Sequence, residues 1–244
     1  MQMARAKYFA RFHVTEVQQT FYQPPQVKTL EAWRAEAPPD FEFTLKAWQL
    51  ITHTPNSRTY RRLSKPIAPG TESRYGRFQL TDEVLAAWNT TLACTRALAA
   101  RFLLFQCPAS FTPTRDNLAN LRRFFGHIRH DRTGLILGFE PRGEWPVELV
   151  RDLTAELNLV YVVDPFVDEP IEQGDLRYLR LHGMPGTNYK YIYTDEELRR
   201  LLDWCTVPTT YVMFNNVSMV PDAERFIRLL DGKYSGPADR MADS

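Results

Sequence analysis

The sequence predicts an α/β protein built as a TIM-type (β/α) barrel. Short strand-like runs alternate with helix-like stretches along the whole chain, which is typical of a parallel sheet with helices outside it. Several runs, such as residues 159–163, are apolar almost throughout, as in strands buried on both faces. The length of 244 residues fits the roughly 250 residues of such a barrel. An open doubly wound sheet is the alternative, but no Gly-rich turn follows an early strand.

The N-terminal part is expected to hold a helix, a strand, a second helix and a second strand. Residues 4–12 form the last turns of a helix, and the strand at 13–21 ends before a pair of prolines. Residues 27–36 carry apolar side chains at helical spacing, and a second proline pair stops that helix. The next strand is therefore expected at 41–48.

The middle of the chain begins with a long irregular segment, residues 54–80, rich in Pro, Gly and Ser. Thr81 then caps a helix that runs to about residue 100, because a threonine hydroxyl accepts from a free backbone N–H at a helix start. A strand at 101–107 follows and ends at a proline. Thr114 caps the next helix, which runs to about residue 130.

The last part repeats the alternation of strands and helices. Pro146 opens one helix, and Thr194 with three acidic residues after it caps another. The strands are expected at 133–139, 159–163, 175–181 and 209–214, and the helices at 146–157, 194–205 and 222–230. A flexible tail is expected after residue 232. The count is seven strands, so the first strand of an eight-stranded barrel is expected to be missing.

Composition favours one soluble, cytoplasmic domain spanning 1–244. The net charge of +1 provides no global basic field for nucleic acid or anionic membranes. The chain has three cysteines, an odd number, and they are too far apart for a CxxC-type metal site. They are therefore expected to be reduced thiols. The N-terminus has no continuous signal-peptide core, and no apolar run reaches the roughly 20 residues that span a bilayer. No membrane partner is therefore expected, and the oligomeric state is not indicated.

Polar residues stand where the expected strands end. In a parallel barrel these ends share one mouth, which is where such folds hold their chemistry. Residues i and i+2 of a strand share a face, so Glu16 and Gln18 point the same way, as do Glu140 and Arg142, and Arg180 and His182. The candidate mouth residues are Glu16, Gln18, Lys46, Gln106, Glu140, Arg142, Asp164, Arg180, His182, Asn215 and Asn216, with His53 just beyond the second strand.

The catalytic hypothesis is acid/base chemistry on an anionic ligand. Glu140 or Asp164 would be the base and His182 the acid or proton shuttle. Arg142 and Arg180 would bind the anion. The alternative is a closed network of ion pairs that ties the strands together.

Three residues of the mouth each have two possible roles. Lys46 is a candidate for a Schiff base with a carbonyl substrate, or for an ion pair with Glu16 or Glu140. Asn215 and Asn216 are candidates for hydrogen bonds to a ligand or for capping the following turn.

A divalent metal is a possible cofactor. The residue types that would bind it are imidazoles and carboxylates, although no HExxH-like motif is present. The candidate ligands are His53, Glu140, Asp164 and His182.

Two loops are candidates for ligand contact. Residues 54–80 hold six basic side chains against one acidic residue, with aromatic side chains between them, a composition that suits phosphates and bases. A solvated surface excursion explains the same composition. The second loop, residues 183–193, offers aromatic walls for a sugar or base, or ordinary packing. The residues are Arg58, Arg61, Arg62, Lys65, Arg74, Arg77, Glu72, Tyr60, Tyr75 and Phe78 in the first loop, and Tyr189, Lys190, Tyr191 and Tyr193 in the second.

The chain also resembles the YecE-like family, a widespread domain of unknown function. The matching segments are residues 17–22, 43–47, 51–53, 105–108, 139–142, 178–183 and 214–216. The resemblance implies a TIM-barrel fold with a pocket, and it carries no settled reaction. The family usually opens with a strand that carries a Gly-rich motif ending in Gly and an aromatic residue, and this chain departs from the pattern because it lacks that segment.

The functional prediction is an uncharacterised TIM-barrel protein, favoured as an enzyme, that binds a small phosphorylated or sugar-like ligand at the barrel mouth. Two alternatives belong to other classes. One is a protein that binds or processes nucleic acid with the basic loop at 54–80. The other is a non-catalytic interaction protein whose loops bind a partner.

Overall fold

The computed structural model describes residues 3–131, 134–172 and 174–234, with side chains to residue 232. The chain divides into two compact units, residues 1–161 and 162–244. Strand β5 (Val160–Val163) begins in the first unit and ends in the second.

Seven parallel strands occur in the described residues, and each pairs with the next along the chain. In the described residues a helix follows every strand except β5, which leads directly to β6, and the predicted α/β class with TIM-type (β/α) topology is confirmed. The other strands are β1 (Val14–Val17), β2 (Glu42–Lys46), β3 (Phe102–Gln106), β4 (Ile136–Glu140), β6 (Leu176–Leu181) and β7 (Thr209–Phe214).

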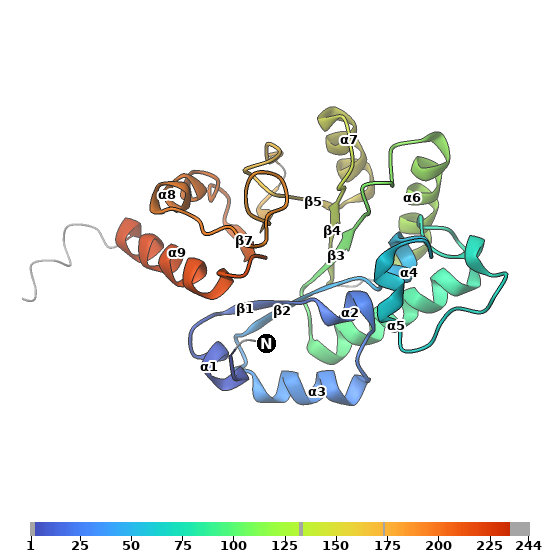
Figure 1. Cartoon of the computed structure of the whole chain (residues 1–244), viewed down its shortest axis with the longest axis horizontal. Helices are drawn as coiled ribbons and strands as arrows, with labels where there is room; N and C mark the ends of the chain where they lie inside the picture. The colour runs from blue at the N-terminus through green and yellow to red at the C-terminus, as the bar shows by residue number, and fades with distance from the viewer. Residues whose placement is uncertain (1–2, 132–133, 173, 235–244) are drawn as a thin grey trace, which may run out of the picture. The chain divides into compact units, whose positions relative to one another are not determined.

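The first unit contains strands β1 to β4 and, among its described residues, seven α-helices. Its core is formed by the apolar residues of β2, β3 and β4 together with the inner faces of the helices. Helix α3 (Val27–Glu36) packs along α5 (Asp82–Leu98), as Figure 1 shows at the lower right. The remaining helices are α1 (Arg5–Phe9), α2 (Gln19–Tyr22), α4 (Gln49–Thr52), α6 (Arg115–His127) and α7 (Val147–Leu157).

The strand predicted at 13–21 is wrong in its second half. Strand β1 ends at Val17, and residues Gln19–Tyr22 form helix α2. The buried hydroxyl of Thr20 donates to the carbonyl oxygens of Val17 and Lys46, which fixes the chain where it leaves the strand. Phe21 is buried as well, so burial of this turn overrides the strand-forming tendency of its residues.

The segment at 54–80 is irregular as predicted, with 3₁₀ turns at Arg58–Arg62 and Glu72–Arg74. Phe78, placed by the sequence among ligand-contacting aromatics, is instead fully buried. Its ring lies 5.4–5.8 Å from the rings of Phe105, Phe111, Phe124 and Phe125. The loop is therefore anchored to the core by one aromatic side chain.

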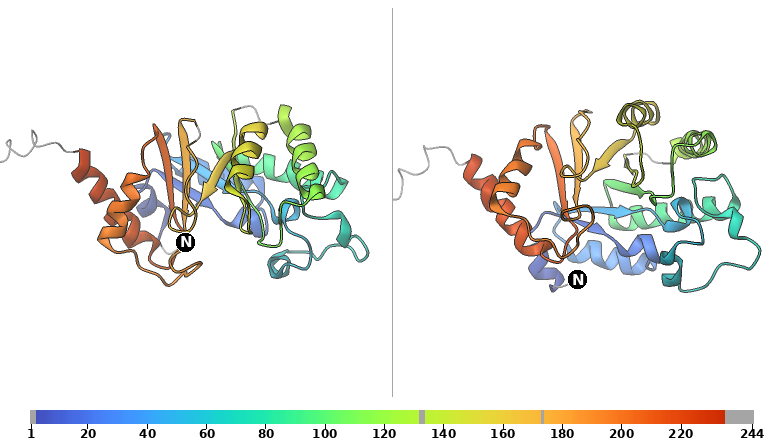
Figure 2. Two further views of the ribbon diagram at one scale, coloured as in Figure 1. Left: turned by 90° about the horizontal axis from the view of Figure 1, so that it is seen from above. Right: turned by 45° about the horizontal axis from the view of Figure 1, so that its top comes forward.

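The second unit contains the end of β5, strands β6 and β7, and helices α8 (Asp195–Asp203) and α9 (Met219–Tyr234). Both helices lie on the same side of the β6–β7 pair in the two views of Figure 2. Thr194 and Glu197 form a capping box at the start of α8, as the predicted cap required.

Helix α9 is longer than the predicted helix at 222–230, because it begins at Met219 and ends at Tyr234. Pro221 is tolerated in its first turn, where backbone N–H groups have no intrahelical partner. The predicted tail after residue 232 is therefore helical for two residues, and its remainder lies outside the described residues. Among the helices described, none has both the length and the apolar character needed to cross a membrane.

Candidate functional site

The second unit buries a row of three charged or titratable side chains at the strand ends. Asp164 follows β5, Arg180 lies near the end of β6, and His182 follows that strand. Their exposed fractions are 7%, 1% and 1%, respectively. The three form the Asp164–His182–Arg180 row, and burial makes it costly unless its members are paired.

The carboxylate of Asp164 is fixed by backbone donors. The N–H of His182 donates to Asp164 Oδ2 at 2.8 Å, and the N–H of Phe166 donates to Oδ1 at 3.1 Å. His182 Nδ1 lies 3.4 Å from the same Oδ2 atom. Asp164 therefore orients the imidazole and the backbone at the end of β6.

His182 faces Arg180 with its other ring nitrogen. Nε2 of His182 lies 3.3 Å from Nη1 of Arg180. A guanidinium only donates hydrogen bonds, so Nε2 is the acceptor in this contact. In the neutral imidazole the proton is then on Nδ1, facing the carboxylate of Asp164.

The turn after His182 requires glycine. Gly183 has a φ of +80°, and a Cβ there would lie 2.0 Å from the carbonyl oxygen of Asn188. Its N–H donates to the hydroxyl of Tyr193 at 2.8 Å. Tyr193 is fully buried, and burial, followed by the charge of Asp164, raises its pKa well above the ordinary value. The sequence pointed to Tyr193 only as a possible aromatic wall.

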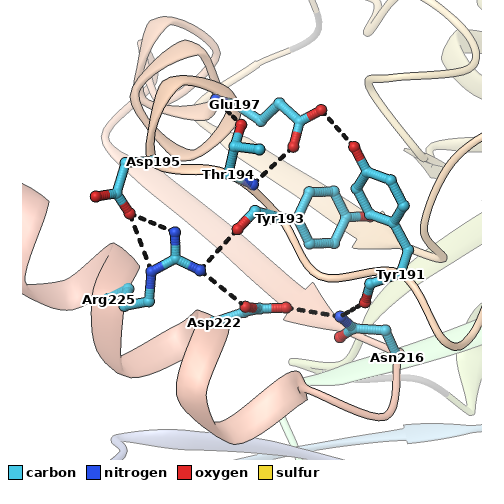
Figure 3. Close-up of polar contacts among 8 residues, drawn as sticks. All are labelled: Tyr191, Tyr193, Thr194, Asp195, Glu197, Asn216, Asp222 and Arg225. Atoms are coloured by element: carbon cyan, nitrogen blue, oxygen red, sulfur yellow. Dashed lines mark hydrogen bonds and ion pairs between the residues drawn. The ribbon is translucent and has the colours of Figure 1, made fainter.

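A second polar network joins the loop at 183–193 to α8 and α9 (Figure 3). The hydroxyl of Tyr191 donates to Glu197, which raises the pKa of Tyr191 to about 12. Arg225 donates to the carbonyl of Tyr193 at 2.7 Å and pairs with Asp195 and Asp222. This network is structural, because its groups bind one another.

The two asparagines after β7 differ. The side-chain amide of Asn216 donates to the carbonyl of Tyr191 at 2.8 Å and to Asp222 at 2.7 Å, so it fixes the turn into α9. Asn216 is buried, whereas Asn215 is partly exposed and its backbone N–H donates to the carbonyl of Leu181 at 2.8 Å. Of the two roles considered, these bonds favour capping for Asn216.

The first unit brings Lys46 and Gln106 together at the ends of β2 and β3. The ammonium of Lys46 donates to Gln106 Oε1 and lies 4.0 Å from the ring centroid of Phe21. The ring supplies a cation–π contact that the predicted strand at 13–21 gave no reason to expect. Lys46 is 4% exposed, and such burial is compatible with either role predicted for it.

His53 lies directly after α4 in the same unit. Its Nδ1 is 2.7 Å from the hydroxyl of Thr52, and its ring meets that of Phe21 edge to face at 5.0 Å. Burial, followed by the charge of Lys46, lowers the pKa of His53 to about 3. The imidazole is therefore neutral at physiological pH.

The two predicted i, i+2 pairs of the first unit are in contact. Glu140 is buried, and its Oε1 lies 3.2 Å from Nη1 of Arg142. The side-chain amide of Gln18 donates to Glu16. The register also places Gln106 directly beside Glu140, so the ends of β3 and β4 share polar side chains.

A metal site is not formed within the part of the chain that the structure describes, since no three His, Cys, Asp or Glu side chains come together there. The predicted divalent metal therefore gains no support from the geometry.

Comparison with known proteins identifies the family and the fold. The family model described as "Protein of unknown function DUF72" matches residues 3–243. A DUF72 family protein from Enterococcus faecalis V583 is 20% identical with a TM-score of 0.68, over 93% of each chain. One from Thermotoga maritima MSB8 is 21% identical with a TM-score of 0.64, over 93% of this chain and 88% of that chain.

A xylose isomerase domain containing protein from Salmonella typhimurium LT2 is more distant. It is 14% identical with a TM-score of 0.55, over 93% of this chain and 90% of that chain. None of the curated proteins matches. At these identities the solved structures carry the fold alone.

Proposed function

The chain belongs to the DUF72 family, the YecE-like family of unknown function, and from that premise we propose that it is an enzyme that moves a proton on a small anionic ligand. His182 is the proton-transfer group, Asp164 orients it, and Arg180 attracts the anion. The observation that carries the proposal is the buried Asp164–His182–Arg180 row at the ends of β5 and β6.

The geometry supports His182 in this role because each ring nitrogen has a distinct neighbour. Nδ1 faces the carboxylate of Asp164, which stabilises the imidazolium that forms when Nε2 takes up a proton. Nε2 faces Arg180. A ligand anion that binds the guanidinium takes over the N–H that Arg180 directs at Nε2, which frees the lone pair of Nε2 to accept a proton from the ligand.

The class of ligand is inferred from the guanidinium of Arg180. A guanidinium binds carboxylates and phosphates through paired N–H donors, and it does so more strongly where water is excluded. A small phosphorylated or sugar-like acid is therefore the proposed substrate class. In the first unit, Glu140 and Lys46 stay candidate catalytic residues, and Glu16, Gln18, His53, Gln106 and Arg142 stay candidate ligand contacts.

The test is a binding and turnover screen with inorganic phosphate, hexose phosphates and sugar acids. We expect His182→Gln to keep ligand binding and to lower turnover by about 10²–10⁴-fold, the usual contribution of general acid–base catalysis. Arg180→Gln, or Arg180→Lys if the first variant does not fold, should weaken binding itself.

Arg177 on the same strand is the matched control. It is also buried, and it donates to the carbonyl of Trp204 and the hydroxyl of Thr206. Arg177→Gln should lower stability and leave ligand affinity unchanged. If Arg180 and Arg177 variants differ only in stability, the row is a structural ion-pair network and the proposal fails.

A second candidate function is nucleic-acid binding by the loop at 54–80. The observation that favours it is exposure, since all six basic side chains of the loop are exposed. Neutralising several phosphates would make binding to a single-stranded oligonucleotide fall steeply with salt. Affinity that does not change with salt would exclude this candidate.

A further inference from the structure

The segment Gly76-Arg77-Phe78 has a positive φ at three successive residues. The values are +78°, +53° and +54°. Glycine adopts this conformation readily, but arginine and phenylalanine do so at a cost. Such backbone persists only where the surrounding structure fixes it, and it occurs preferentially at functional sites.

Three backbone hydrogen bonds fix this segment onto the end of α4. Gly76 N–H donates to Leu50 O at 2.9 Å, Arg77 N–H to Thr52 O at 3.2 Å, and Phe78 N–H to Ile51 O at 2.9 Å. Gly76 is also packed so tightly that a Cβ would lie 2.4 Å from the carbonyl oxygen of His53. Together with the buried ring of Phe78, these contacts determine where the backbone of Arg77 stands.

Arg77 itself is the exposed residue of the three, and it lines a small pocket. The other lining residues are Thr52, Thr54, Pro108, Ser110 and Phe111, and the empty volume, open solvent included, is about 170 Å³. In the described residues the guanidinium of Arg77 makes no hydrogen bond or ion pair, and no acidic side chain lines the pocket.

We propose that this pocket is an oxyanion-binding site that takes a single phosphate group, with Arg77 as its cation and Ser110 as its hydroxyl donor, since the hydroxyl of Thr54 already donates to Asn56. A guanidinium beside a hydroxyl group, without a carboxylate, matches the acceptors of a phosphate. The pocket is shallow and open to solvent, so a phosphate would sit at its mouth, either alone or as part of a larger ligand. The site lies within the first unit and does not depend on the role of His182.

The positive φ of Arg77 also predicts how two of its variants differ in stability. Glycine would adopt its φ without cost, so an arginine there keeps a strained backbone in exchange for its side chain. The substitution Arg77→Gly should therefore unfold at a temperature no lower than Arg77→Gln, while both lose the anion. A purely structural Arg77 would show no loss of anion binding in either variant.

The experiment is calorimetric titration of the full chain with inorganic phosphate and, separately, with a short single-stranded oligonucleotide. We expect Arg77→Gln to weaken binding of at least one probe by about tenfold, the size of one charge-assisted contact. Arg101→Gln is the control from the same unit and outside the loop, because Arg101 is exposed and pairs with Glu42 at 3.1 Å. It should leave both affinities unchanged.

The two probes distinguish the sources of the phosphate. Loss of inorganic phosphate binding in Arg77→Gln supports a small phosphorylated ligand, and loss confined to the oligonucleotide supports a polymer phosphodiester. Both titrations are repeated in Arg180→Lys, which should weaken binding at the Asp164–His182–Arg180 row, so that binding at the row is separated from binding at Arg77. The proposal is overturned if Arg77→Gln changes neither affinity, or if the wild-type chain binds neither probe.

Discussion

The loop at 183–193 comes after the polar end of β6, and the loop at 54–80 comes after the polar end of β2 and the short helix α4. The polar groups of the first loop bind other groups of the protein, whereas the basic groups of the second face solvent. In the first, the hydroxyls of Tyr191 and Tyr193 bind Glu197 and the N–H of Gly183 within the protein. In the second, the backbone is held in place while the cations are exposed. Groups that satisfy one another hold the fold, and anchored groups that face solvent are the better ligand candidates.

The largest expected effect comes from removing the buried side chain of Phe78, which anchors the loop at 54–80 to the core. Phe78→Ala should lower the free energy of unfolding by about 3–5 kcal/mol, because it empties a site enclosed by four aromatic rings. Denaturant unfolding measures the loss. Leu80→Ala, at a position 42% exposed, is the control and should change stability little. Equal effects would mean that the loop is not anchored by Phe78.

The turn into α9 tests the internally satisfied region. Asn216→Ala should cost about 1–3 kcal/mol of unfolding free energy, because the buried carboxylate of Asp222 and the carbonyl of Tyr191 lose a donor. Asn215→Ala, at a partly exposed position, should stay within about 0.5 kcal/mol of the wild type. A large loss in Asn215→Ala alone would reverse the assignment of the capping role.

The buried, neutral imidazole of His53 makes the free energy of unfolding depend on pH. Its folded pKa, about 3, lies below the ordinary 6.5, so the unfolded chain takes up the proton first. Stability is therefore full above pH 6.5 and falls as the pH drops towards 3, by up to about 1.4 kcal/mol per pH unit.

The measurement is the slope of unfolding free energy against pH for the wild type and for His53→Asn. The variant should be less sensitive to pH between 6.5 and 5.5, because its side chain does not titrate. Identical slopes in the two proteins would contradict burial of a neutral imidazole at this position.

The smallest expected effect is on Tyr191. Its hydrogen bond to Glu197 raises the pKa of the phenol to about 12. Ultraviolet titration of Glu197→Gln should bring this pKa back towards the ordinary 10.0, with Tyr191→Phe identifying the signal. A pKa unchanged by Glu197→Gln would show that another group holds the phenol protonated.

The fold class was predictable because the strands of the middle and C-terminal parts are apolar runs bounded by caps and prolines. The i, i+2 rule also predicted the contacts of Glu140 with Arg142 and of Arg180 with His182. Helix α2 was not predictable, because four residues carry too little periodicity and their conformation depends on burying Phe21.

Other features depended on contacts that sequence spacing does not encode. The cation–π contact of Lys46 with Phe21 joins two elements whose packing only the fold defines. Asp164 is held by the backbone N–H groups of Phe166 and His182. Every residue except proline has such a donor, so the sequence does not indicate this contact. The positive φ of Arg77 arises from the anchoring of its neighbours, so composition alone gave no sign of it.

The most direct test of the central claim is the imidazole ¹⁵N spectrum of His182, assigned with His182→Gln and titrated with the anions that the chain binds. We predict a saturable shift of the Nε2 resonance, because this atom lies 3.3 Å from Arg180, and loss of the shift in Arg180→Lys. A bound anion that leaves the His182 resonances unmoved would contradict the proposed role of the Asp164–His182–Arg180 row.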